Sequence, residues 1–365
     1  MKKILYIVNN DHPESYPLEL ATYLKDTGND VAIMVLYKKS SCYENASGVT
    51  RYYVNAAGVM DLRAIRRFVT FIKKNRPAIV HTHHTFSAFV ASLFCRTNGI
   101  PTVFTVHNDH KHLKMYQNLF NFWTFLFSDL IVCNSNNSQK QLFGIEKLIA
   151  RNKVNVVYNG VNVRRIIAQK PSRSTLAHIY GFRKNSFLLA TTGRLTWQKD
   201  FGTLIKAIKL VTELIPDIQL VIIGGGYLQN QLQALIERLD LQGIVHITSS
   251  LYRDDVYCLI NSVDAFVMTS FTEGFCNALV EAMAIAKPVV CTDIPVFKEI
   301  VGEHGLYAKA HDAVDFRNQL VKVITTKKEE RLAVGKRLKN RVTKMFCIEE
   351  TATNYLKHYS SLLNR

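Results

Sequence analysis

The sequence is poor in several features that would place it in other classes of protein. Its longest charge-free, apolar-rich stretch, residues 115–128, has 14 residues, which is too short to cross a bilayer as a helix. Met1, Lys2 and Lys3 lead directly into a short apolar run without a small-residue cleavage site, so we expect no secretory signal. The seven cysteines are odd in number, scattered and without a CxxC pair. They favour reduced thiols in a cytoplasmic protein over a disulfide framework.

Metal-binding spacings are also missing. The chain contains no HExxH, no Cys and His pairs at zinc spacing and no Asp-x-Asp. Several histidines nevertheless gather in the first half, and a metal site is one interpretation of them. They follow different expected strands and a loop, which fits a single ligand set poorly. These residues are His81, His83, His84, His107, His110 and His112.

The composition fits a globular protein of two ordinary domains. The chain has 365 residues, of which 48% are hydrophobic and 21% charged, and it shows no short internal repeat. The formal net charge is +17, and the excess of Lys and Arg is larger in residues 1–165 than in the rest. Such an excess predicts an anionic partner, namely a membrane surface, a nucleic acid or a phosphorylated substrate. A solvated basic surface explains it equally well.

Strand-like and helix-like segments alternate along both halves, which predicts an α/β fold with two doubly wound parallel sheets. The polar, basic stretch 163–185 contains Pro171 and predicts the boundary, giving domains 1–165 and 166–347. Ligands of such sheets bind at the carboxyl ends of the strands. The expected strands are 2–8, 30–36, 78–83, 101–107, 129–135, 154–161, 186–194, 218–226, 244–248, 265–270 and 287–292. The expected helices are 14–26, 62–75, 86–97, 115–127, one from 138, 203–214, 228–239, 254–262, 277–285, 313–325, 328–345 and 349–363.

Two glutamates eight residues apart form the most informative motif, TSFTEGFCNALVEAMAIAKPVV. Glu273 lies in the loop between an expected strand and helix, and Glu281 lies about two turns into that helix. The backbone N–H groups of Gly274, Phe275 and Cys276 are expected to point the same way as the loop carboxylate. That combination can hold a phosphate on the N–H groups and a sugar hydroxyl on the acid. An ordinary strand–helix unit with two surface acids is the alternative.

A second motif, TTGRLTWQKDFGTLIKAI, follows the first strand of the second half. Arg194 and Lys199 lie in a loop that opens a helix, where a planar guanidinium and a mobile ammonium suit a diphosphate. Two solvated surface cations are the alternative. Glycines 224–226 end the next strand and would let the backbone approach a ligand closely, or they form a simple turn.

Together these motifs resemble the donor-binding signature of retaining glycosyltransferases with the GT-B fold, glycosyltransferase family 4. The resemblance covers nearly the whole chain and implies two Rossmann-like domains facing a cleft. It implies an N-terminal acceptor domain completed by the last helix, within 348–365, and a C-terminal domain that binds the nucleotide sugar. Asp200 departs from the family, which usually has Gly after the lysine.

The resemblance also implies residue roles. Glu273 orients the donor sugar, Glu281 holds the ribose, and Arg194 and Lys199 hold the diphosphate. His107, in TVFTVHND, reaches the sugar and the developing charge; a structural strand-end histidine is the alternative. The implied catalytic set is Glu273, His107, Arg194 and Lys199. The implied donor-binding set is Arg194, Lys199, Gly225, Gly226, Tyr252, Glu273, Gly274, Phe275, Cys276, Asn277 and Glu281.

The acceptor side is less well defined. Family members often have Gly-Gly and an acid near residue 15, whereas this chain has Asn9-Asn10-Asp11-His12-Pro13-Glu14. Contacts through side chains are expected instead. Asn159 belongs to a segment, 158–162, that resembles the family's Asn-Gly-Val-Asp hinge, with Asn in place of Asp. The candidates are His12, Glu14, Asp109 and Asn159.

The implied chemistry is transfer of a hexose or N-acetylhexosamine, with UDP the favoured nucleotide, with retention of configuration. The leaving phosphate takes the acceptor proton, so no enzymic nucleophile or general base is named. Because Asp-x-Asp is absent, we expect neither a metal nor any other cofactor.

The distribution of charged and aromatic residues predicts the location of the protein in the cell. The segment Met115–Phe127 is rich in aromatic residues and either lies in a membrane interface or packs in the core. A basic cluster favours the membrane. We therefore expect a cytoplasmic protein at the face of the anionic inner membrane, acting on a lipid-linked or lipopolysaccharide-type acceptor for O-antigen or capsule. The basic cluster is Arg63, Arg66, Arg67, Lys73, Lys74 and Arg76.

Two other functions remain open. A sugar-nucleotide epimerase of the same fold would consume the donor without an acceptor. A non-catalytic basic protein that binds nucleic acid or membrane would not need Glu273, Arg194 or Lys199. The chain contains no recognised nucleic-acid motif, so we expect no nucleic-acid partner.

Overall fold

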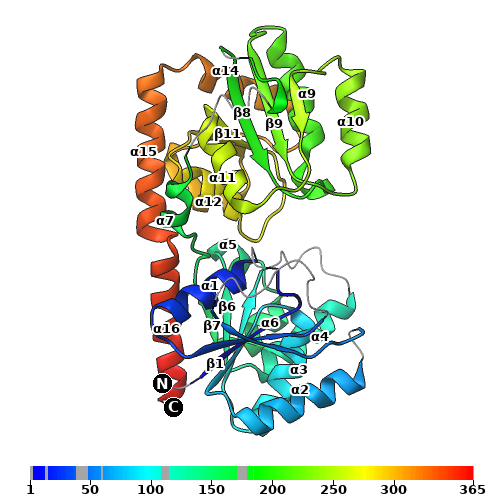
Figure 1. The fold of residues 1–365 in the computed structure, drawn as a ribbon, viewed down its shortest axis with the longest axis vertical. Coiled ribbons are helices and arrows are strands. Elements are labelled where there is room, and N and C mark those ends of the chain that lie inside the picture. Colours follow the sequence, from blue (N-terminus) through cyan, green and yellow to red (C-terminus); the bar gives the residue numbers. More distant parts are fainter. Residues whose placement is uncertain are drawn as a thin grey trace. The chain divides into compact units, whose positions relative to one another are not determined.

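The computed structural model describes residues 3–12, 15–37, 48–58, 61–107, 115–170, 179–183 and 185–364, without the side chains of 115–117. Its contacts divide the chain into two compact units (Figure 1). Unit 1 comprises Met1–Asn159 and Ile348–Arg365, and unit 2 comprises Gly160–Cys347. The division lies six residues before the boundary expected at 165/166. Val161 forms an isolated β-bridge with Cys347, and both residues belong to unit 2.

Unit 1 contains a parallel sheet in the order β3-β2-β1-β4-β5-β6-β7. The strands are β1 (Ile4–Val8), β2 (Val31–Val35), β3 (Thr50–Tyr53), β4 (Ile79–Thr82), β5 (Thr102–Val106), β6 (Leu130–Cys133) and β7 (Val154–Val156). The helices are α1 (Tyr16–Asp26), α2 (Leu62–Asn75), α3 (Thr85–Thr97), α4 (Met115–Phe127), α5 (Asn136–Lys140), α6 (Gly144–Ile149) and α16 (Ile348–Leu363). Six of these strands and the helices α2 and α4 were expected. The edge strand β3 was not, and the last strand is shorter than 154–161.

Helices cover both faces of this sheet. On one face α1 and α16 bury their apolar side chains against alternate positions of the strands, such as Tyr6, Ile33 and Val103. On the other face α2, α3, α4 and α6 pack on the remaining positions. The last helix is held by hydrogen bonds as well, because Tyr359 lies 2.9 Å from the Tyr6 hydroxyl and Tyr355 lies 2.8 Å from that of Thr105.

Unit 2 contains a parallel sheet in the order β10-β9-β8-β11-β12-β13. The strands are β8 (Phe187–Thr192), β9 (Ile218–Ile223), β10 (Val245–Ile247), β11 (Ala265–Met268), β12 (Val289–Thr292) and β13 (Leu306–Ala308). The α-helices are α7 (Val163–Ala168), α9 (Phe201–Thr212), α10 (Gln229–Arg238), α11 (Arg253–Ser262), α12 (Asn277–Ala284), α13 (Pro295–Val301), α14 (Ala313–Thr325) and α15 (Lys328–Met345). Two 3-10 turns, η2 (Trp197–Lys199) and η3 (Gly302–His304), lie between them.

The first six residues of the segment 163–185, which was expected to be a linker, are helical instead. Residues Val163–Ala168 form α7 because the Asn162 side chain caps the helix by accepting from the Arg165 amide, and Ile166 is buried. The pair α13 and β13 was also not expected. In the part of the chain that the structure describes, no helix is long and apolar enough to cross a membrane.

Candidate active site

The loops after β8, β9 and β11 of unit 2 are joined by backbone hydrogen bonds. The Leu195 amide donates to the Gly225 carbonyl at 3.0 Å, and the Phe271 amide donates to the Gln198 carbonyl at 3.2 Å. The Thr269 hydroxyl donates to the Lys199 carbonyl at 2.8 Å. Because these loops follow the carboxyl ends of neighbouring parallel strands, they form one surface where a ligand of this fold is expected.

Glycines 224 and 226 are needed for contact between two protein loops. A Cβ on Gly224 would lie 2.1 Å from the Gly193 carbonyl oxygen, and one on Gly226 would lie 2.5 Å from that of Leu195. Gly224 also has a φ of +145°, which side-chain-bearing residues rarely adopt. At Gly225 a Cβ would meet only the Ser250 side chain, at 3.1 Å. The glycine run therefore fixes the β8 and β9 loops against each other.

Lys199 and Glu273 form a close ion pair across this surface. Their Nζ and Oε1 atoms lie 2.6 Å apart, and each side chain is 17% exposed. Burial acts to lower the pKa of Lys199, but the Glu273 carboxylate outweighs it, so the pKa is raised above its usual value. The lysine therefore stays positively charged at neutral pH, with the carboxylate as its counter-ion.

Arg194 lies in the same loop and is exposed. Within the described residues, no hydrogen bond or ion pair is formed by its guanidinium, although its charge acts on Lys199. The loop thus presents one paired and one unpaired cation, and both Arg and Lys side chains can bind phosphate oxygens.

Asp200 occupies the left-handed conformation that explains why relatives often have glycine there, with φ +47° and ψ +44°. The Asp200 carboxylate caps α9. It accepts hydrogen bonds from the Thr203 amide at 3.3 Å and from the Thr203 hydroxyl at 2.8 Å. His311 Nδ1 lies 2.7 Å from Asp200 Oδ2, the oxygen that also accepts from the Thr203 hydroxyl. The departure from the family pattern therefore leaves a well-anchored loop, and neither residue's pairing was visible in the sequence.

Helix α12 begins at Asn277, as expected, and Cys276 is its N-cap. Phe275 is buried and packs on Phe346, with ring centroids 5.9 Å apart, so it anchors the loop that carries Glu273 and Gly274. Burial raises the pKa of the Cys276 thiol to about 12, so this residue stays a neutral thiol. The helix start next to Lys199 and Glu273 adds a partial positive charge to the site.

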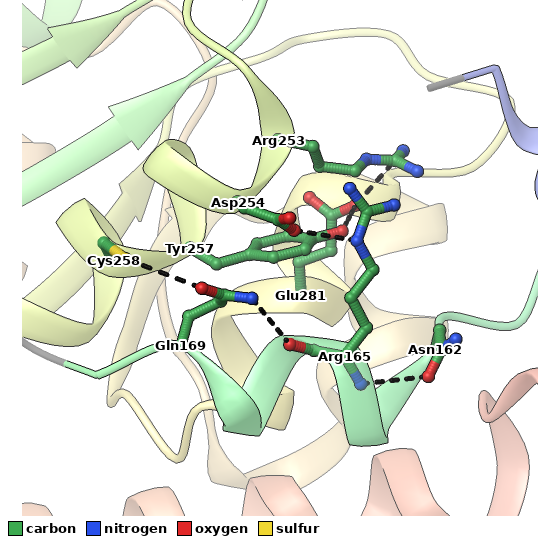
Figure 2. A network of polar contacts seen from close by, with 8 residues as sticks. All are labelled: Asn162, Arg165, Gln169, Arg253, Asp254, Tyr257, Cys258 and Glu281. Carbon is green, nitrogen blue, oxygen red and sulfur yellow. Dashed lines mark hydrogen bonds and ion pairs between the residues drawn. The ribbon is translucent and has the colours of Figure 1, made fainter. Parts of the chain in front are cut away.

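Glu281 is buried in α12, on the side that faces α11 (Figure 2). Its Oε1 atom lies 3.3 Å from Arg253 Nη2 and 3.2 Å from the Tyr257 hydroxyl. Glu281 was expected at the donor, and neither of these partners was expected. Their i, i+4 spacing at the start of a helix was the available signal. Tyr252, expected at the donor, is the exposed N-cap of α11.

Unit 1 brings three of the histidines together at the ends of β4 and β5. His83 Nδ1 lies 2.8 Å from His107 Nε2, and the His81 and His83 ring centroids are 4.3 Å apart. Burial lowers the pKa of His107 to about 3, and it lowers the pKa values of His81 and His83 well below the usual value. All three imidazoles are therefore neutral at pH 7. In the described ranges no group of three His, Cys, Asp or Glu residues is arranged to hold a metal ion.

The structure describes two of the four acceptor-side candidates. His12 is exposed and Asn159 is buried. Glu14 and Asp109 lie outside the described residues. Beside His12, Asp11 is fully buried and accepts a hydrogen bond from the Tyr53 hydroxyl at 3.0 Å. Because β3 was not expected, this contact of the atypical first loop could not be anticipated.

Comparison with known proteins gives the class. The family model described as Glycosyltransferase Family 4 matches residues 13–165, and that described as Glycosyl transferases group 1 matches residues 172–341. The chain is 27% identical over 291 residues to an Escherichia coli UDP-Gal:alpha-D-GlcNAc-diphosphoundecaprenol alpha-1,3-galactosyltransferase, covering 75% of this chain and 73% of that protein. It is 25% identical over 334 residues to the putative glycosyltransferase EpsD of Bacillus subtilis, covering 87% and 86%.

Solved structures give the fold. HepE of Anabaena in complex with UDP and glucose superposes with a TM-score of 0.82 at 18% identity, covering 99% of this chain and 100% of that one. Sucrose-phosphate synthase of Thermosynechococcus elongatus superposes with a TM-score of 0.86 at 16% identity, covering 100% of both. The two parallel-sheet units are those of a GT-B glycosyltransferase. The chain belongs to glycosyltransferase family 4, the glycosyl transferases group 1.

Proposed function

We propose that the protein transfers a hexose or N-acetylhexosamine from a UDP-sugar to a lipid-linked or lipopolysaccharide-type acceptor, with retention of configuration and without a metal. The observation that carries this proposal is the Lys199–Glu273 pair beside the exposed Arg194, at the start of α12. Support for the nucleotide and acceptor comes from relatives, namely the UDP-galactose and diphosphoundecaprenol named for the E. coli enzyme and the UDP bound to HepE. The proposed setting is bacterial O-antigen or capsule assembly.

The site suits departure of a nucleoside diphosphate. Arg194 and Lys199 would stabilise the negative charge that grows on the leaving phosphates, a role that a metal ion fills in other enzymes. Glu273 would accept hydrogen bonds from sugar hydroxyls, and Glu281 from the ribose. His107, neutral at pH 7, would donate a hydrogen bond to the sugar without adding charge. The leaving phosphate would take the acceptor proton.

The test is a product assay with purified protein, a panel of UDP, GDP and ADP sugars, and a polyprenyl-diphosphate-linked N-acetylglucosamine acceptor, in EDTA. We expect one nucleotide class to be consumed only when acceptor is present, and Arg194→Ala to abolish most of this activity. Donor conversion without acceptor would favour the epimerase instead. Absence of any donor binding would contradict the proposal and favour a binding protein.

We also propose that unit 1 contacts the anionic cytoplasmic face of the inner membrane through the helices α2, α4 and α6. The exposed side of α2 lines a groove beside β3 with Arg63, Arg66, Arg67 and Lys74. Helix α4 is both a core and a surface helix, because Phe125 is fully buried whereas other apolar residues of α4 and α6 are exposed. The exposed residues are Leu119, Trp123, Leu126, Ile145 and Leu148. Cations of this kind are worth about 1 kcal/mol each near an anionic bilayer.

Vesicle co-sedimentation tests this surface. The double variant Arg63→Glu/Arg66→Glu should weaken binding to phosphatidylglycerol vesicles by about tenfold or more. A matched control, Lys25→Glu/Lys357→Glu, makes the same change in charge on the exposed sides of α1 and α16, which cover the opposite face of the sheet. Equal losses for both variants would mean that only net charge matters and would contradict the assigned surface.

A further inference from the structure

The buried carboxylate of Glu281 depends on two partners from the neighbouring helix. Glu281 lies about one turn into α12 and its side chain is only 7% exposed, a position in which an unpaired carboxylate is costly. Arg253 and Tyr257 of α11 both reach it, and Figure 2 shows their side chains turned toward it. Because the two residues are four apart in a helix, they lie on the same side of α11 and meet the acid together.

Both contacts end on the same carboxylate oxygen. Arg253 Nη2 lies 3.3 Å and the Tyr257 hydroxyl 3.2 Å from Glu281 Oε1. An ion pair and a hydrogen bond to one oxygen restrain the rotation of the carboxylate and hence the direction of the second oxygen. The partners are themselves enclosed, since the Arg253 side chain is 16% exposed and Tyr257 is almost completely buried. Because Arg253, Tyr257 and Glu281 are all enclosed and in contact, each restricts the conformations of the others.

A second ion pair secures the first turn of α11. Arg165 of α7 contacts Asp254 with its Nε atom 2.7 Å from Oδ1. Asn261, at the other end of α11, donates to the Gln169 carbonyl at 2.9 Å. Helix α7 therefore braces α11 at both ends, and Arg253 begins from a fixed backbone position. This second pair is more exposed, with side chains 34% and 47% accessible.

We propose that Arg253 is a positioning residue for recognition of the nucleotide ribose. With Tyr257, it holds Glu281 in the orientation in which its carboxylate accepts hydrogen bonds from the ribose hydroxyls. The inference rests on the proposed function, which places Glu281 at the ribose. It adds that the neighbouring guanidinium, absent from both donor motifs of the sequence, sets how strongly the hydroxyls are recognised.

The test compares binding of UDP and 2′,3′-dideoxy-UDP by calorimetry. Wild-type protein should prefer UDP by about tenfold or more, because the dideoxy analogue leaves a buried acceptor unpaired. Arg253→Ala should lose most of this preference while its affinity for the dideoxy analogue changes less than about threefold. Arg253→Lys, which keeps the charge, should retain part of it, and Arg183→Ala, which breaks the exposed pair with Asp217, should retain all of it. Melting curves establish that each variant is folded.

A double-mutant cycle identifies the route by which Arg253 acts. Adding Arg253→Ala to Glu281→Ala should weaken UDP binding no further, since the carboxylate that it positions is already gone. Equal weakening of UDP and dideoxy-UDP by Arg253→Ala would overturn the proposal, as would additive losses in the cycle. If wild-type protein binds none of UDP, GDP or ADP, the proposed function itself fails. If it binds UDP without a ribose preference, only the present inference fails.

Discussion

Glu273→Ala is expected to lower kcat by about a thousandfold, the scale set by removing one group that stabilises charge at a transition state. The carboxylate lies 2.6 Å from Lys199 Nζ, so its removal takes away the sugar contact that we propose and also the partner that orients the lysine. Kinetic assays should show the loss mainly in kcat. Affinity for UDP, which lacks the sugar that is transferred, should change little, whereas Arg194→Ala should weaken it by about tenfold or more.

The pair also predicts a stability change. Both side chains are mostly buried, and removing one partner leaves the other charge without compensation, at a cost of about 3 kcal/mol. Lys199→Ala/Glu273→Ala should therefore be more stable than either single variant, while its kcat falls no further than that of the worse single variant. Chemical denaturation and steady-state assays measure the two quantities.

A matched control is available in the same unit. Asp217→Ala removes a carboxylate whose partner Arg183 lies 3.5 Å away, in a pair that is largely exposed and precedes β9. Such pairs contribute about 1 kcal/mol or less, so kcat and stability should be close to those of wild type. A Glu273→Ala variant that matched this control in kcat would contradict the assigned site.

The fold could be predicted well wherever a long segment carries a clear pattern. The helices α2, α4, α14 and α15 were expected with the bounds that the structure has. In α2, for example, Ala64, Phe68 and Ile72 recur at helical spacing after the capping Asp61. The strand β3 has four residues at a sheet edge, one exposed and three half-buried, and β13 has three, of which two are half-buried and Ala308 is buried. Strands this short bury too few apolar residues to produce an alternating pattern, and their pairing depends on the rest of the sheet.

The candidate site, too, could be predicted only where the sequence pattern is local. Arg194 and Lys199 in one loop, and Glu273 in another, could be proposed because the spacing within each motif is local and resembles that of a known family. Contacts between elements could not. The meeting of Glu281 with Arg253, or of Asp200 with His311, depends on how helices and loops pack across more than twenty residues of sequence. The glycines 224 and 226 were expected to make room for a ligand, and the neighbouring loop already occupies that space.

Gly224→Ala is expected to be strongly disruptive in unit 2. The added Cβ would lie 2.1 Å from the Gly193 carbonyl oxygen, and backbone on both sides leaves no flexible side chain to move away. The φ of +145° adds strain of about 1–3 kcal/mol. We expect a loss of about 3 kcal/mol or more in the free energy of unfolding. The β8 loop, which carries Arg194, would also have to move, so UDP affinity should fall by about tenfold even in the folded variant.

The same substitution at Gly202 should act in the opposite direction. Gly202 lies in the first turn of α9, and a Cβ there would meet only the end of the Leu235 side chain, at 4.0 Å. Because alanine loses less backbone entropy than glycine on entering a helix, Gly202→Ala should stabilise the protein by about 0.5–1 kcal/mol and leave UDP binding unchanged. Calorimetric melting and titration of both variants measure the contrast. Equal stability of the two would mean that the β8 and β9 loops can separate without cost, and the close glycine contact would then not be what holds the cationic loop in place.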